Sequence, residues 1–249
     1  MIMKLRQAIT QEVQDYRLLL RNVPSVVMAL FVVSVILMNL LANKEIQVNV
    51  SWLALDCGLL VSWLSFLAMD MLTKRFGPRA AVKLSLTAVA INLLVCSILY
   101  IVSAIPGNWA AFYTYESEVV NSGLDNTIGG TWYVLLGSTV AFIVSSIVNS
   151  ITNASIGKLA KKDNFVTYAI RSYISTMLGQ FVDNLVFSLI VSHIFFGWTL
   201  TQCITCAITG CIVELVCEIV FSPLGYKVCK QWEAQDVGKN YLDYKEMQK

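Results

Sequence analysis

Six long apolar stretches, joined by short polar connections, dominate this sequence. An α-helix rises about 1.5 Å per residue, so about 20 apolar residues are needed to cross the hydrocarbon core of a bilayer. Each stretch is close to that length or longer. We therefore predict an all-α membrane protein, a bundle of six transmembrane helices at about residues 24–41, 52–72, 81–105, 131–156, 166–195 and 198–223.

The composition agrees with this class. Hydrophobic residues make up 57% of the chain and charged residues only 14%, whereas a soluble domain has about a quarter charged residues. The mean hydropathy is +0.66. The net charge of +2 is too small to indicate a nucleic-acid partner. The expected surroundings are therefore a lipid bilayer.

Lys and Arg alternate between the connections. The segment before the first stretch has four, the next five connections have one, four, none, four and none, and the tail has five. Cytoplasmic connections are enriched in Lys and Arg, so we predict a multi-pass protein of the cell (inner) membrane with both termini in the cytoplasm. The expected parts are a leader (1–23), a transport domain (24–223) and a soluble cytoplasmic tail (224–249).

Two segments outside these stretches have amphipathic features. Residues 1–23 fit either an interfacial amphipathic helix or a short polar lead-in. The connection after residue 105 lacks Lys and Arg, and its aromatic residues are typical of a membrane interface, so it can hold a short interfacial segment. These aromatic residues are Trp109, Phe112, Tyr113 and Tyr115.

Residues 171–187, RSYISTMLGQFVDNLVF, carry polar groups inside an apolar stretch. A helix places Thr176, Gln180, Asp183 and Phe187 on one face. Ionisable groups at membrane depth are energetically expensive and usually face a bundle interior or a water-filled cavity. Asp183 falls near the middle of the predicted span, so we expect it to face such a cavity.

Other polar residues are predicted at three depths, which a path through the bundle requires. The outer tier is Asn39, Asn43, Lys44 and Asp56; the middle tier is Gln180, Asp183 and Glu214; the inner tier is Asp70, Asn153, Arg171 and Glu218. Asn149 is predicted somewhat to the cytoplasmic side of the middle tier. The predicted substrate-binding residues are Asn39, Asp70, Asn149, Arg171, Gln180, Asp183 and Glu214. The predicted inner gate or pair is Arg171, Asp70 and Glu218.

Structural roles compete with these functional ones. Asp70 can simply pair with Arg75 or Arg171, and Arg171 can extend its guanidinium to the interface. Asn149 and Asn153 can serve as hydrogen bonds between helices. One of the two glutamates of the last stretch, Glu214 or Glu218, can be a protonated packing residue.

A cavity lined by carboxylates and amides favours a small, flat, uncharged solute with several hydrogen-bond donors. Trp132, Phe181, Phe187 and Trp198 can supply a stacking face. The sequence has no Walker, H-E-x-x-H or G-x-S-x-G motif, so we predict neither an enzyme nor a cofactor. The seven Cys are expected to be packing residues: the C-x-x-C of Cys203 and Cys206 stands alone, and His193 is the only His, so no metal site is predicted.

The chain also resembles the queuosine precursor transporter family, also called the vitamin uptake transporter family, over about residues 35–225. The most specific part is R-S-x-x-S-T-x-x-x-Q-x-x-D-x-x-x-F, residues 171–187. Weaker markers are Asn39 with Asn43-Lys44, Asp70 before Phe76-Gly77, and a Ser-rich fourth stretch ending at Asn153. The chain departs from the family pattern at Arg75 and Phe76, and at Ala141 and Asn153.

The resemblance implies a bundle similar to the substrate-binding subunits of energy-coupling-factor transporters. It also implies uptake of a 7-deazaguanine: the 7-cyano or aminomethyl precursor, or queuine. Asp183 and Gln180 would then bind the polar edge of the base. Arg171 and Asp70 would form the inner gate or pair.

Three hypotheses remain open at this stage. The first is a stand-alone secondary transporter, proton-coupled through Asp183 or Glu214. The second is a substrate-capture subunit that needs an ATPase complex and uses Ser25 and Ala29 as coupling contacts. The third is a membrane scaffold without a ligand.

Overall fold

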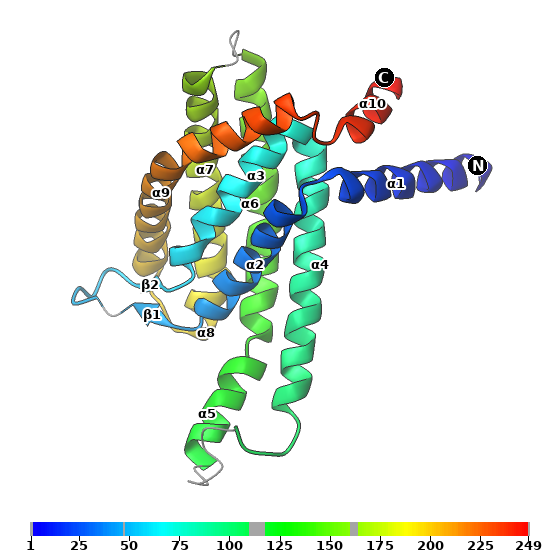
Figure 1. Ribbon diagram of the computed structural model, residues 1–249. Helices are drawn as coiled ribbons and strands as arrows, with labels where there is room; N and C mark the ends of the chain where they lie inside the picture. The colour runs from blue at the N-terminus through cyan, green and yellow to red at the C-terminus, as the bar shows by residue number, and fades with distance from the viewer. Residues whose placement is uncertain (1, 47, 110–117, 160–163, 249) are drawn as a thin grey trace.

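The computed structural model describes residues 2–46, 48–109, 118–159 and 164–248, and these are mostly helical (Figure 1). Of the aromatic residues singled out above, Phe112, Tyr113 and Tyr115 lie outside the described residues, as do three of the counted lysines, Lys161, Lys162 and Lys249. The helices are α1 (Ile2–Asn22), α2 (Ser25–Leu41), α3 (Leu59–Phe76), α4 (Pro78–Ser103), α5 (Glu118–Gly129), α6 (Trp132–Leu159), α7 (Phe165–Phe187), α8 (His193–Phe195), α9 (Leu200–Ala234) and α10 (Lys239–Met247). A π-helical turn (Ser188–Ser192) joins α7 to α8, and strands β1 (Glu45–Ile46) and β2 (Leu55–Asp56) pair antiparallel.

The longer helices form a bundle with α7 in a central position. α7 packs against α6 and α9, and α3 packs against α2, α4 and α9. α1 and α10 contact each other and lie at one end of the bundle, so both termini lie at the same end (Figure 1). A chain with an even number of membrane crossings has this arrangement.

The bundle is apolar outside and polar inside. Along α9, a stripe at helical spacing is between 45% and 63% exposed: Ile204, Ile208, Ile212, Val216 and Val220. Asn149, Gln180, Glu214 and Glu218 are fully buried. This reverses the distribution in a soluble domain, and an exposed apolar surface of this extent marks a membrane contact. The structure and the sequence therefore agree on an all-α membrane protein.

Four helical segments of the described chain are long and apolar enough to cross a bilayer: Pro78–Ser103, Glu118–Lys158, Phe165–Phe195 and Leu200–Ala234. A fifth arises if α1 and α2 count as one broken span; the chain bends by 102° between them. α3 has 18 residues but carries Asp70, Lys74 and Arg75. α2 alone has 17 residues, about 26 Å of helix, slightly less than the hydrocarbon thickness.

Two predicted boundaries differ from the helices found. α3 begins at Leu59 rather than near Trp52, because the intervening residues include β2, whose Leu55 pairs with Ile46. α9 continues past Pro223 to Ala234, into the segment predicted as a soluble tail. At 35 residues it is about 52 Å long and must extend beyond the hydrocarbon core.

Pro223 lies inside α9, which bends along its length (Figure 1). Proline has no N–H, so the Ile219 carbonyl loses its usual helical donor. The Ser222 hydroxyl donates to this carbonyl at 3.3 Å and replaces part of the lost interaction. The bend directs the last turns of α9 across the end of the bundle.

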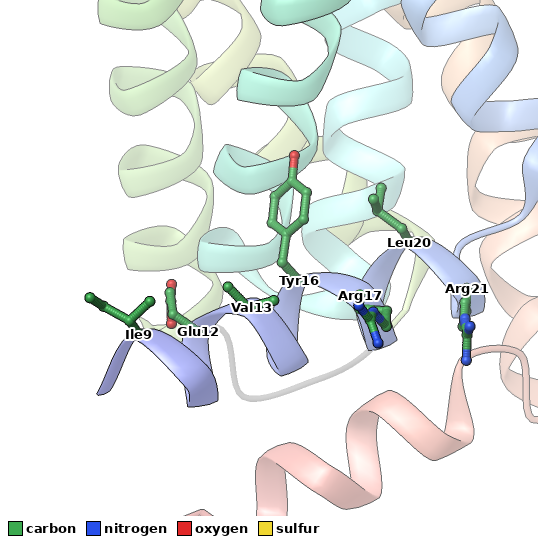
Figure 2. Close-up of a pocket in the computed structure, with 7 residues that line it drawn as sticks. All are labelled: Ile9, Glu12, Val13, Tyr16, Arg17, Leu20 and Arg21. Atoms are coloured by element: carbon green, nitrogen blue, oxygen red, sulfur yellow. The ribbon is translucent and has the colours of Figure 1, made fainter. Parts of the chain in front are cut away.

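α1 is a helix, which agrees with the first of the two readings of residues 1–23. Figure 2 shows Ile9, Tyr16 and Leu20 on the side of α1 that faces the bundle, with Arg17 and Arg21 pointing away. The apolar side of α1 is therefore on the same side as the bundle helices.

A charged contact holds α10 on α1, and an aromatic contact holds α10 on the end of α3. Asp15 is almost fully buried, accepts a hydrogen bond from Lys83 of α4 and forms an ion pair with Lys245 of α10 at 3.0 Å. Tyr241 is 1% exposed and packs against Phe76, with ring centroids 6.2 Å apart. The N-terminal helix, α4 and the C-terminal helix thus share one small core.

We predict that Tyr241→Ala releases α10 while the bundle stays folded. Truncating a buried aromatic side chain costs about 3–5 kcal/mol, and each 1.4 kcal/mol is about a factor of ten in an equilibrium constant. Tryptic cleavage at Lys239 should therefore accelerate at least about tenfold. The control is Tyr244→Ala, which alters a partly exposed tyrosine on the same helix. Equal cleavage rates in both variants would contradict this role of Tyr241.

The contact of α10 with α1 through Asp15 and Lys245 should survive mild acid. Burial raises the pKa of Asp15, but the hydrogen bonds and charges of Lys83 and Lys245 outweigh this and hold the pKa below its usual value. A lowered pKa gives stability that is present above the unfolded value of about 3.9 and is lost as the pH falls through the folded value. Relative to cleavage of an unstructured peptide at the same pH, which corrects for the loss of trypsin activity in acid, cleavage at Lys239 should thus stay slow at about pH 5 in the wild type and be fast at every pH in Asp15→Asn.

Candidate functional site

Asp183 lines a small polar cavity in the bundle. The cavity lies between α2, the segment from β2 into α3, α6 and α7. Its lining is Met38, Asn39, Ala42, Asp56, Gly58, Leu59, Ser62, Ser138, Asp183, Asn184 and Phe187. We call this the Asp183 cavity. Its volume is about 30 Å³, which matches about one water molecule.

The spacing on α7 explains why Asp183 reaches this cavity. Asp183 and Phe187 are one turn apart, and both line it. The Ser145 hydroxyl of α6 donates to Asp183 Oδ1 at 2.7 Å, and among the described residues Oδ2 has no hydrogen-bond donor. Asp183 therefore has acceptor capacity that a ligand can use.

Asp56 is held at the mouth of the same cavity by the backbone. The Gly58 N–H donates to Asp56 Oδ1 at 2.7 Å. A Cβ at Gly58 would lie 2.6 Å from the Met38 carbonyl oxygen and 2.8 Å from Asp56 Oδ1. Only glycine lets the chain pass this close to α2 while keeping Asp56 in the lining.

A second set of residues, the Glu214 cluster (Ser62, Gln180, Asn184 and Glu214), adjoins the cavity. Glu214 is fully buried and accepts hydrogen bonds from the Ser62 hydroxyl and from Asn184 Nδ2, the latter at 3.0 Å. With its amide oriented to donate, Gln180 is 3.0 Å from Glu214 Oε1. Ser62 and Asn184 also line the Asp183 cavity, so the cluster and the cavity share two side chains.

A third set, the Asp70 cluster, lies between α3, α6, α7 and α9. Asp70 is fully buried, and five side chains of α6 and α7 are positioned to donate to it. They are Asn149 (3.1 Å), Asn153 (3.0 Å), Thr176 (3.2 Å), Ser175 (3.5 Å) and Ser172. Ser172 Oγ is also within hydrogen-bond distance of Glu218 Oε1 of α9.

Arg171 joins this cluster through an intermediate residue. Its guanidinium donates to Asn153 Oδ1 at 2.8 Å, and Asn153 donates to Asp70. A Cβ at Gly157 would lie 2.6 Å from Arg171 Cζ, so the missing side chain leaves room for the guanidinium. Among the described residues, no ion pair joins Arg171 to Asp70, and Arg75 instead donates to the Val237 carbonyl at 2.9 Å.

The predicted residues are thus divided among three places. Asn39 and Asp183 line the cavity, Gln180 and Glu214 are in the Glu214 cluster, and Asn149, Asp70, Arg171 and Glu218 are in or beside the Asp70 cluster. Of the proposed stacking residues, Phe187 lines the cavity. Trp132 is 50% exposed, and the Trp198 indole donates to Glu45.

The predicted substrate-binding set left out five residues that the structure brings to these sites. Asp56, Ser62, Ser138 and Asn184 line the cavity, and Ser145 binds Asp183. Ser138 and Ser145 are seven residues apart, two helical turns, and this polar stripe was the available signal. Asp56 was predicted in the outer tier but not in the binding set, and Ser62 gave no signal, because their proximity to α7 depends on the β1–β2 hairpin and the packing of α3.

The cysteines take part in packing and hydrogen bonding. Cys203 and Cys206 are buried beside Ala54 and Trp198, and Cys203 Sγ lies 3.4 Å from the Ser188 carbonyl oxygen. The described residues contain no group of three or more His, Cys, Asp or Glu side chains that could hold a metal ion.

A comparison with protein families identifies a match over most of this chain. The model described as "Putative vitamin uptake transporter" matches residues 56–228, from β2 into the later part of α9. The matched region includes Asp70, Arg171, Asp183 and Glu214. Neither the curated proteins nor the solved structures contain a match. The chain belongs to the vitamin uptake transporter family, whose description assigns it to membrane transport of a small molecule.

Proposed function

We propose that this protein imports a queuosine precursor across the cell membrane: a 7-deazaguanine such as the 7-cyano form, the aminomethyl form or queuine. The observation that carries the proposal is the cavity beside Asp183, which joins two carboxylates, two amides and an aromatic ring. These groups match the chemistry of a flat heterocycle with several N–H donors.

In this proposal the two carboxylates accept the N–H groups of the base. Asp183 and Asp56 lie in one lining, and Asn39 and Asn184 add groups that both donate and accept. Phe187 provides a face for stacking. The lining contains no Lys or Arg, so a strongly anionic solute fits it less well.

Binding requires the cavity to enlarge. Small-molecule pockets usually have volumes of about 300–1,000 Å³, whereas this cavity has about 30 Å³. α7 supplies Asp183, Asn184 and Phe187, so movement of α7 against α2 and α3 would widen the site. Such opening and closing is what alternating access demands of a carrier.

The proposed topology has six crossings, α2, α3, α4, α6, α7 and α9, with both termini cytoplasmic. It is supported by the alternating Lys and Arg counts and by the termini lying at one end of the bundle. α1 would lie along the cytoplasmic interface, with Ile9 and Val13, each 55% exposed, toward the acyl chains.

A second candidate function is substrate capture for an energy-coupling ATPase complex. Ser25 and Ala29 are exposed on α2, one turn apart, in line with exposed Val33 and Leu37. Small residues at this spacing let another helix approach closely. A membrane-embedded coupling subunit would fit this stripe.

We predict that Asp183→Asn reduces uptake of labelled queuine by cells about tenfold to a hundredfold. A hydrogen bond to a charged group contributes about 1.5–3 kcal/mol, and each 1.4 kcal/mol is about tenfold in affinity. Asp243→Asn, an exposed aspartate of α10, is the matched control and should transport normally. Membrane levels of each variant are measured with an epitope tag. Normal uptake by Asp183→Asn would remove Asp183 from the site.

Reconstitution separates the two candidate functions. We predict that the purified chain alone, in liposomes, equilibrates labelled queuine across the bilayer. A capture subunit would bind queuine but would not move it without its ATPase. In that case Ala29→Leu should abolish complex formation, because the larger side chain blocks close helix approach.

A further inference from the structure

The Asp70 cluster has fewer hydrogen-bond donors than its acceptor atoms require. Ser172 Oγ lies within hydrogen-bond distance of Asp70 Oδ2 and of Glu218 Oε1. A serine hydroxyl carries one hydrogen, so it can donate to only one of these two oxygens. If both acids were ionised, one carboxylate oxygen would face a lone pair of Ser172.

Two further acceptors in this region have no donor. Glu218 Oε2 and Asn149 Oδ1 are buried without a hydrogen-bond partner, and both residues are fully buried. Such atoms are costly, because a buried acceptor without a donor loses its hydration without compensation. The cluster therefore has more acceptors than the protein supplies with hydrogens.

The two acids differ in how well they can carry a negative charge. Asp70 has up to five donors from α6 and α7, enough for an ionised carboxylate. Glu218 has one hydrogen-bonding partner, Ser172, and forms no ion pair among the described residues. Adding a proton to Glu218 Oε1 lets this acid donate to Ser172 Oγ, while Ser172 donates to Asp70 Oδ2.

The charged and titratable groups of the packed helices leave this assignment in place. α3 contributes Asp70 and, one turn on, Lys74, which lies over the Tyr168 ring. α7 contributes Arg171, which binds Asn153, and the two tyrosines Tyr168 and Tyr173; Tyr173 hydrogen-bonds with Ser222 of α9 at 2.8 Å. α9 itself carries Glu214, one turn from Glu218, together with Cys217, Tyr226 and Cys229.

The proton site and the Asp183 cavity share α7, and α9, which carries Glu218, adjoins the cavity through the Glu214 cluster. α7 and α9 are joined at Ser172–Glu218 and, further along, where Gln180 and Asn184 bind Glu214. Widening the Asp183 cavity by moving α7 would strain both contacts. Separating Ser172 from Glu218 opens the acid to water, to which it can give up its proton.

We propose that Glu218 carries the proton that couples this transporter to the proton gradient, with Ser172 linking it to Asp70; this rests on the proposed transport function. On release, the proton passes from Glu218 Oε1 to water. When the two helices close again without the proton, the Glu218 carboxylate competes with Asp70 for the single Ser172 hydrogen. Proton loss thereby weakens the closed arrangement of α7 and α9.

Infrared difference spectroscopy of the purified protein during a pH jump tests the proton site without a substrate. We expect the wild type to show the C=O stretching band of a protonated carboxylic acid, and Glu218→Gln to lose one component of it. Ser172→Ala should shift that component, because the hydrogen bond from the acid is gone. Glu246→Gln, an exposed glutamate, is the control and should match the wild type. An unchanged band in Glu218→Gln would overturn the assignment.

Liposomes with labelled queuine and an imposed gradient test the coupling. At one proton per queuine and with the membrane potential held at zero, one pH unit drives about tenfold accumulation. The wild type should accumulate queuine, whereas Glu218→Gln should reach only equal concentrations inside and outside while retaining exchange. Accumulation by Glu218→Gln, or accumulation driven by sodium and indifferent to pH, would overturn the proposal. If the wild type moves no queuine, the proposed substrate fails, and the infrared result still decides whether Glu218 holds a proton.

Discussion

The absence of water from the bilayer core is the constraint on which this structure depends. A polar group inside the bundle must find its partner in the protein, or it raises the free energy of the fold by several kcal/mol. Asp70 satisfies this condition with neutral donors: amides and hydroxyls from α6 and α7 converge on one carboxylate of α3. This convergence links three helices and sets their register, which apolar packing against lipid-like neighbours would define less sharply.

The same constraint explains the division between the cavity and the clusters. Where donors suffice, as around Glu214, the side chains are satisfied by each other and the bundle is closed. Where acceptors exceed donors, as at Asp183 and Glu218, the protein retains capacity for something else. In the functions proposed above, the N–H groups of a solute donate to Asp183, and a proton neutralises Glu218.

Much of the fold could be predicted from local patterns. Apolar length located α4, α6 and the start of α9, and helical spacing placed Asp183 and Phe187 on one face, both in the lining of the cavity. The start of α3 and the end of α9 were harder to predict. α3 starts after a hairpin whose register depends on backbone pairing. α9 runs through Pro223, which favours a helix end when it is judged from sequence alone.

The site was harder to predict than the fold, because it depends on contacts between distant segments. Arg171 was expected beside Asp70, yet Asn153 lies between them, and only the short approach at Gly157 explains where the guanidinium goes. Asp56 joins the lining because Gly58 lets the backbone pass close to α2. No helical or strand period connects these residues, so only the packed structure relates them.

The proline in α9 has a mechanical consequence. A helix that lacks one internal hydrogen bond bends at that point with less energy than elsewhere. The last turns of α9 lead into α10, which is anchored to α1 through Lys245 and Asp15. The segment before Pro223, which carries Glu214 and Glu218, can therefore tilt about this point while the end of the chain stays fixed.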